Sequence, residues 1–265
     1  MEILQTAILG VIQGLTEFLP ISSDGHLILV RHLFSWSDQG LLFDAVLHLG
    51  TFLAVLIYFR ETWVRLLKTI LKKGTRNDEM LLGLLVLATI PGALLGFFGK
   101  DFIEQYFRGV SAAGFGFLIT AALLYFADKV SLKNKDRVVK ERMSIWQTIG
   151  VGVMQAVALL PGVSRSGSTI SGGIFAGLSR ESAVEFSFLM AMPITGGAGL
   201  VALLKDFGQS GVNWPSLFVG FLFSFFVGLW AIKFLIKRIS QRASLRPYVI
   251  YLIVVAIVSF AVAKL

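Results

Sequence analysis

The chain has 265 residues, of which 55% are hydrophobic and 15% are charged, and its mean hydropathy is +0.78. A typical soluble domain carries about 25% charged residues, so this composition excludes an ordinary soluble protein and predicts an all-α integral membrane protein. The net charge of +8 does not indicate nucleic-acid binding, because most Lys and Arg residues lie in short stretches between apolar segments. The chain has no cysteine, which excludes disulfides and thiolate metal sites.

The first apolar region, residues 1 to 30, is interrupted midway by a polar sequence. Gln13 and Glu17 lie one helical turn apart and so share a helix face, and Pro20 then breaks the helix. Polar groups at membrane depth are tolerated mainly inside protein or in a wet cavity, so this cluster is a candidate functional site. The region is predicted to form a re-entrant helical hairpin, whose tip carries Ser22, Ser23, Asp24, Gly25 and His26.

Six later apolar runs are each long enough, at about 17 to 25 residues, to cross a bilayer as a helix. They lie at residues 42–59, 80–98, 111–127, 186–204, 216–236 and 247–264. Between the third and fourth runs, residues 145–178 are apolar but interrupted by PGVSRSGST at 161–169. This segment is predicted to form a second re-entrant hairpin.

The basic residues predict how these elements are oriented. Lys and Arg are concentrated in the connections 60–79, 127–145, 178–182 and 237–246, which we expect on the cytoplasmic side. The first hairpin then enters the membrane from outside and the second from inside.

The two interrupted regions also resemble each other. A constant shift along the chain aligns Gly10 with Gly152, Gln13 with Gln155, Ser22 with Ser164, Gly25 with Gly167 and Ile28 with Ile170. We therefore expect one membrane domain built as an inverted-topology repeat of residues 1–130 and 143–265, with both tips near the midplane.

The second tip has the chemistry of an anion site. Arg165 offers a rigid guanidinium fork to phosphate oxygens, and the start of the following half-helix, near Gly167, adds backbone N–H donors. The alternative is that Arg165 pairs with Glu17 only to neutralise both charges. The expected phosphate-binding groups are Ser22, Ser164, Ser166, Thr169, Gly162 and Gly167.

The first tip offers groups for catalysis. Glu17 with Gln13 could hold a hard divalent cation, magnesium or calcium. Ser22 or Ser23 could act as a nucleophile and His26 could exchange protons, although serines here could also cap a helix and His26 could be a satisfied interior residue. Asp44 and His48, one turn apart, could support the site or simply pair with each other.

QGLTEFLPISSDGH at 13–26, followed by LLPGVSRSGSTISGG at 159–173, resembles the undecaprenyl-pyrophosphate phosphatase family, also called bacitracin-resistance proteins. FDAVLHLGT at 43–51 and EFSFLMAMP at 185–193 extend the resemblance over nearly the whole chain. It implies an enzyme of the bacterial plasma membrane that removes the terminal phosphate of a polyprenyl diphosphate. The product would be the monophosphate lipid carrier used for peptidoglycan, and the active site would open toward the outer face.

The resemblance also implies residue roles. It places the acidic motif on Gln13 and Glu17, and Gln13 stands where many members have a second glutamate. Asp24 stands where threonine is common. We expect Ser23 to attack the terminal phosphorus and His26 to handle protons, while His26 or a metal-bound water as nucleophile stays open. The phosphates would be held by Ser164, Arg165, Ser166 and Thr169.

Two other functions use the same features. Inverted repeats that meet at the midplane are also the architecture of transporters, so a polyprenyl-phosphate transporter is the alternative function. A pure carrier does not need Ser23 and His26, which favours the phosphatase. An ion channel is disfavoured because the sequence has no filter-type repeat, and the sequence leaves open whether the chain forms oligomers.

Overall fold

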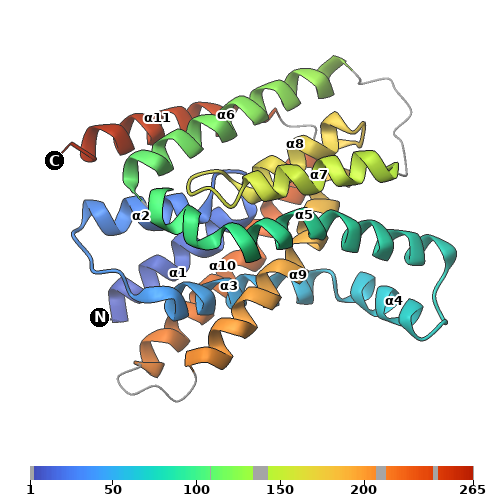
Figure 1. Ribbon diagram of the computed structural model, residues 1–265, viewed down its shortest axis with the longest axis horizontal. Helices are drawn as coiled ribbons and strands as arrows, with labels where there is room; N and C mark the ends of the chain where they lie inside the picture. Colours follow the sequence, from blue (N-terminus) through green and yellow to red (C-terminus); the bar gives the residue numbers. More distant parts are fainter. Residues whose placement is uncertain (1–2, 108, 134–142, 207–212, 241–243, 265) are drawn as a thin grey trace.

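A computed structural model describes residues 3–107, 109–133, 143–206, 213–240 and 244–264, and within these residues the regular secondary structure is entirely α-helical (Figure 1). Parts of two predicted basic connections, residues 134–142 and 241–243, lie outside the described residues. The helices are α1 (Ile3–Phe18), α2 (Ser23–Leu33), α3 (Gly40–Tyr58), α4 (Arg60–Ile70), α5 (Arg76–Phe107), α6 (Val110–Lys133), α7 (Ile145–Val157), α8 (Arg165–Phe175), α9 (Arg180–Asp206), α10 (Trp214–Ser240) and α11 (Arg246–Val262).

The predicted spans each coincide with one helix. In the described part of the chain, α3, α5, α6, α9 and α10 contain stretches long and apolar enough to cross a membrane. The sixth predicted span, residues 247–264, corresponds to α11, an apolar helix of 17 residues, whereas the shortest of those five spans has 19. The prediction of an all-α, multi-pass membrane protein is therefore confirmed, while the count of six spans stays a prediction.

Both interrupted regions form two short helices joined by a tip. α1 ends at Phe18, before Pro20, and α2 begins at Ser23. α7 ends at Val157 and α8 begins at Arg165, slightly earlier than the predicted start near Gly167. Each second helix is capped by a serine side chain from the tip, which accepts a hydrogen bond from a backbone N–H of the first turn.

The packing of the two hairpins follows one pattern. α1 packs along α10 and α7 packs along α5, while α3 lies against α9 and α6 against α11 (Figure 1). The aligned glycines make equivalent approaches: a Cβ on Gly10 would lie 2.6 Å from the Gly220 carbonyl oxygen, and one on Gly152 would lie 2.6 Å from the Ala88 carbonyl oxygen. Thus α1 of the first predicted repeat packs on α10 of the second, and α7 of the second packs on α5 of the first. Such reciprocal packing is what an inverted repeat requires. The division of one domain into repeats 1–130 and 143–265 stays a prediction.

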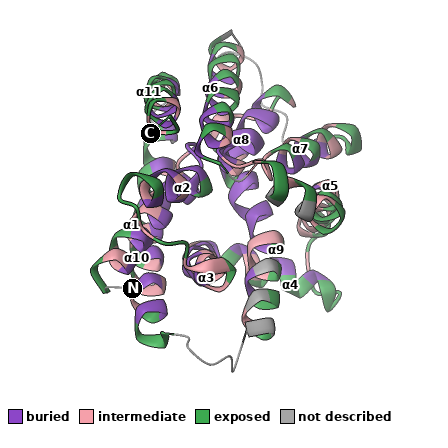
Figure 2. Ribbon diagram, turned by 60° about the vertical axis from the view of Figure 1, so that its left-hand side comes forward, coloured by how far each residue is buried: buried purple, intermediate pink, exposed green. Residues whose placement is uncertain are grey.

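Burial is concentrated where the hairpins enter the bundle. Every residue of α8 from Ser166 to Ile174 is buried, whereas α5, α7 and α11 turn many exposed residues outward (Figure 2). A polar helix such as α8 can lie at the centre of a membrane protein only if neighbouring helices surround it.

A buried carboxylate ties three helices together away from the tips. Asp128 of α6 is 1% exposed and accepts hydrogen bonds from Arg180 Nη2 at 2.6 Å, from the Ser244 hydroxyl at 2.9 Å and from the Leu245 N–H at 2.9 Å. It therefore fixes the first residues of α9 and α11 against the end of α6.

The substitution Asp128→Asn tests this contact. It removes the negative charge that faces the buried Arg180 side chain, so we expect the free energy of unfolding to fall by about 3 kcal/mol. Thermal unfolding in detergent measures the effect. Glu61→Gln is the control, because Glu61 and Arg60 form an exposed pair that contributes little; equal unfolding temperatures for the two variants would contradict the assignment.

Candidate active site

The two hairpin tips lie against each other inside the bundle. A Cβ on Gly25 of the first tip would lie 2.9 Å from the Cα of Gly162 in the second. The Ser166 hydroxyl donates a hydrogen bond to the Leu19 carbonyl at 3.1 Å, which links the tips directly. The predicted meeting of the two tips is therefore present in the structure.

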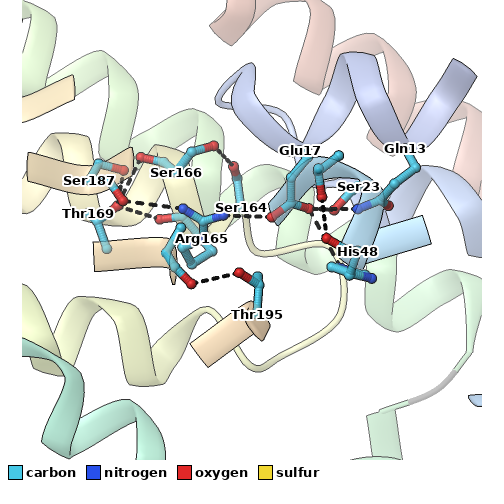
Figure 3. Close-up of polar contacts among 12 residues, drawn as sticks. Gln13, Glu17, Ser23, His48, Ser164, Arg165, Ser166, Thr169, Ser187 and Thr195 are labelled. Atoms are coloured by element: carbon cyan, nitrogen blue, oxygen red, sulfur yellow. Dashed lines mark hydrogen bonds and ion pairs between the residues drawn. The ribbon is translucent and has the colours of Figure 1, made fainter. Parts of the chain in front are cut away.

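A buried ion pair forms the centre of this contact. Arg165 Nη2, at the start of α8, lies 2.6 Å from Glu17 Oε1 near the end of α1 (Figure 3). The side chains are 17% and 7% exposed, respectively. Each charge has its counter-ion at a depth where an isolated charge would be costly.

Three further side chains lie next to the second oxygen of the Glu17 carboxylate (Figure 3). Glu17 Oε2 accepts hydrogen bonds from Gln13 Nε2 at 3.0 Å and from the Ser23 hydroxyl at 2.6 Å. His48 Nε2 of α3 lies 3.6 Å from the same oxygen. Ser23, the predicted nucleophile, therefore has a carboxylate in contact with its hydroxyl proton.

The second tip is braced by its own hydroxyl groups. Ser164 Oγ accepts from the Gly167 N–H at 3.0 Å, and Thr169 donates to the Arg165 carbonyl at 2.8 Å. Thr169 also shares a 2.6 Å hydrogen bond with the Ser187 hydroxyl of α9, and Arg165 Nη1 donates to the Ser187 carbonyl at 3.3 Å. The serine and threonine side chains thus hold Arg165 in place in this structure.

His26 stands apart from Ser23. Its Nδ1 lies 2.7 Å from the Ser22 carbonyl oxygen and its Nε2 lies 2.8 Å from the Tyr251 hydroxyl of α11. Both ring nitrogens are therefore engaged, although His26 and Ser23 share one face of α2. His26 is buried, as expected of either a catalytic or an interior histidine.

Asp44 and His48, which lie one turn apart on α3, have different side-chain partners. The Asp44 carboxylate pairs with Arg31 at the end of α2. His48 bonds through Nδ1 to the Asp44 backbone carbonyl at 2.8 Å, which directs Nε2 toward Glu17 and toward Asp24 Oδ1 at 3.7 Å. His48 therefore supports the site, whereas the Asp44 side chain does not pair with it.

One of the two predicted cation ligands, Gln13, has an unused oxygen atom. Among the described residues, no three His, Cys, Asp or Glu side chains are grouped as metal ligands. Gln13 Oε1 is nevertheless buried and has no hydrogen-bond partner in the described structure, and it belongs to the side chain whose Nε2 bonds to Glu17. One carboxylate and one unused amide oxygen fit a hard cation that takes its other ligands from phosphate.

Two contacts of this site were not predicted from the sequence. Ser187 lies in the EFSFLMAMP segment that carries part of the family resemblance, so that segment could have suggested it. Tyr251 lies among apolar residues of α11, and no pattern in the sequence distinguishes it.

The fold and the site together define a class of protein. It is a multi-pass helical membrane protein whose two buried tips place an arginine, a carboxylate and a serine hydroxyl in one cluster. The model of the family described as bacitracin resistance protein BacA matches residues 6–258. The chain belongs to this family.

Curated relatives agree over nearly the full length. The chain is 42% identical over 265 residues to a protein of Idiomarina loihiensis, with 98% of each chain covered. It is 40% identical over 263 residues to one of Alcanivorax borkumensis, with 97% of each covered. It is also 40% identical over 247 residues to one of Caldicellulosiruptor bescii, with 91% of this chain and 90% of the relative covered. All three relatives are named undecaprenyl-diphosphatase.

Gly162→Ala tests the close packing of the second tip against α6. Gly162 has φ +82°, and a Cβ there would lie 2.1 Å from the Ala113 carbonyl oxygen. We expect the variant to lose at least about 2 kcal/mol of stability through strain and displacement of the tip.

The control for this variant is Gly83→Ala, because a Cβ on Gly83 meets nothing within 4 Å and alanine favours a helix. Thermal unfolding in detergent should separate the two variants. Equal stability would mean that the second tip does not pack against α6 at Gly162 in this way.

Proposed function

We propose that this protein is a membrane phosphatase that hydrolyses undecaprenyl diphosphate to the monophosphate and inorganic phosphate. The observation that carries the proposal is the Glu17 carboxylate, which contacts both the Arg165 guanidinium and the Ser23 hydroxyl. The BacA family match and the names of the curated relatives support the same activity. The alternative of a polyprenyl-phosphate transporter has no comparable support, because the relatives carry the name of an enzyme.

Phosphate binding is assigned to the second tip. A diphosphate brings several negative charges, and its transition state needs equatorial oxygens held by cations and N–H donors. Arg165 supplies the cation, and the first turn of α8 supplies the backbone N–H of Ser166, whereas the Gly167 N–H is bonded to the Ser164 cap. This turn is kept in position by hydrogen bonds of Ser164, Ser166 and Thr169 and by the positive φ of Gly162.

The chemical step is assigned to the first tip. Ser23 attacks the terminal phosphorus: its Oγ–P bond forms, the bridging P–O bond breaks, and the lipid monophosphate leaves. The Ser23 proton passes toward Glu17 Oε2, with which the hydroxyl is already hydrogen-bonded at 2.6 Å. Water then attacks the phosphoserine and inorganic phosphate is released, with His26 handling protons. His26 or water as the nucleophile would use the same residues.

Glu17 and Gln13 are the proposed ligands of a magnesium or calcium ion. When bound, the ion would neutralise phosphate charge and polarise the phosphoryl group. His48 would help to orient the Glu17 carboxylate through its approach to Oε2.

We place the protein in the bacterial plasma membrane, with the site open toward the outer face and the polyprenyl tail in lipid or between helices. The product would return to the pool of carrier lipid used for peptidoglycan, and recycling this pool would confer bacitracin resistance. The lipid substrate and the surrounding bilayer are the proposed partners, and no nucleic acid is expected. An oligomer is compatible with this function but not required by it.

Phosphate release from undecaprenyl diphosphate by purified protein in detergent tests the proposal. We expect release with magnesium or calcium and loss of release with chelator. Ser23→Ala, His26→Ala and Arg165→Ala should each lower the rate at least about a hundredfold. Ser216→Ala, a buried serine of α10 away from the tips, is the matched control and should retain the wild-type rate.

Wild-type protein that binds the lipid but releases no phosphate with any metal would contradict the enzymatic function. Full activity with chelator would contradict only the cation assignment.

A further inference from the structure

A contact outside the proposed phosphate site links α11 to the first tip. The Tyr251 hydroxyl lies 2.8 Å from His26 Nε2, and the two rings are parallel within 2° at a centroid distance of 5.6 Å. Tyr251 is 42% exposed on the outside of the bundle, whereas His26 is 7% exposed. The tyrosine therefore covers the imidazole from the outer surface of the helical bundle.

The other nitrogen of His26 fixes which atom carries the proton. Nδ1 lies 2.7 Å from the Ser22 carbonyl oxygen, which can only accept a hydrogen bond. Nδ1 therefore carries a hydrogen in the neutral ring, and Nε2 presents a lone pair to the Tyr251 hydroxyl. In the imidazolium, Nε2 also carries a hydrogen and donates it to the same hydroxyl oxygen.

A hydroxyl is suited to this position because it can donate and accept. A carbonyl in its place could bond only to the protonated ring, and an ammonium only to the neutral ring. The ring also has an apolar contact, an edge-on approach to Phe117 of α6 with centroids 5.1 Å apart.

The same two helices are joined a second time. His32 Nε2, farther along α2, lies 3.2 Å from the Val262 carbonyl oxygen near the end of α11. The two contacts lie along one face of α11, since Tyr251 and Val262 are three helical turns apart. α11 is thus held against α2 at both positions, and Tyr251 is not an isolated side chain that happens to touch His26.

We propose that Tyr251 is the positioning residue of His26: its hydroxyl donates to Nε2 of the neutral ring and accepts from Nε2 of the imidazolium, so the imidazole keeps one orientation as Nε2 gains and loses its proton. The inference rests on the proposed role of His26 in proton handling. Tyr251 itself touches neither the phosphate groups nor the nucleophile.

Tyr251→Phe is the direct test, because it keeps the ring and removes only the hydroxyl. We expect kcat for phosphate release to be about tenfold lower and KM to be unchanged, since Arg165 still binds the phosphates. Tyr248→Phe is the matched control, because Tyr248 lies one turn earlier on the same helix and packs against the apolar core. It should retain the wild-type kcat and KM.

A second readout does not depend on activity. The chain has three histidines, so protein labelled with ¹⁵N-histidine gives a simple NMR spectrum. The Nε2 resonance of His26, assigned by its loss in His26→Ala, should shift in Tyr251→Phe and stay in place in Tyr248→Phe.

Several results would overturn the inference. They are an unchanged kcat in Tyr251→Phe, a lower kcat without a shift of the Nε2 resonance, or a loss of kcat that is matched by a lower unfolding temperature. Inactive wild-type protein, or a fully active His26→Ala, would instead overturn the proposed function or the role of His26. The NMR comparison still tests the hydrogen bond in those cases.

Discussion

The ion pair between Glu17 and Arg165 is the interaction on which the rest of the structure depends. It joins two hairpin tips that are far apart in the sequence, and both side chains are largely buried. Removing one partner of such a pair typically costs about 3 to 5 kcal/mol, because the other charge is left unpaired in a medium of low polarity. Gln13 and Ser23 donate hydrogen bonds to the other Glu17 oxygen, and Arg165 Nη1 donates one to the Ser187 carbonyl. The Arg165 guanidinium that stabilises the contact of the tips is also the cation that we propose to bind the diphosphate.

This arrangement explains why the helices around the tips are built as they are. Glycines allow α1 and α7 to lie directly on the backbones of α10 and α5, and Gly162 allows the second tip to turn against α6. Close packing of small residues is a common way to join helices in membranes. The helices α6, α7 and α9 surround a short polar helix, α8, that hydrocarbon would not tolerate.

The architecture and the central residues could be predicted from the sequence because both leave local signals. Long apolar runs predict the helices, and Pro20 and the PGVSRSGST segment predict the breaks. Arg165 and Glu17 were predictable partners because charges at membrane depth need a counter-ion. The contacts of single side chains across helices were not predictable. Asp44 pairs with Arg31, and His26 bonds to Tyr251 while Ser23 bonds to Glu17, because the packing angles of α2, α3 and α11 decide these choices. No periodicity in one helix encodes those angles.

The central claim is that Glu17 and Arg165 act as one unit in a single site. A double-mutant cycle on kcat/KM, with Glu17→Gln, Arg165→Gln and the double variant, tests it most directly. We expect strong non-additivity, with the double variant no slower than the slower single variant. Effects that multiply independently would contradict it and would place the two residues in separate roles.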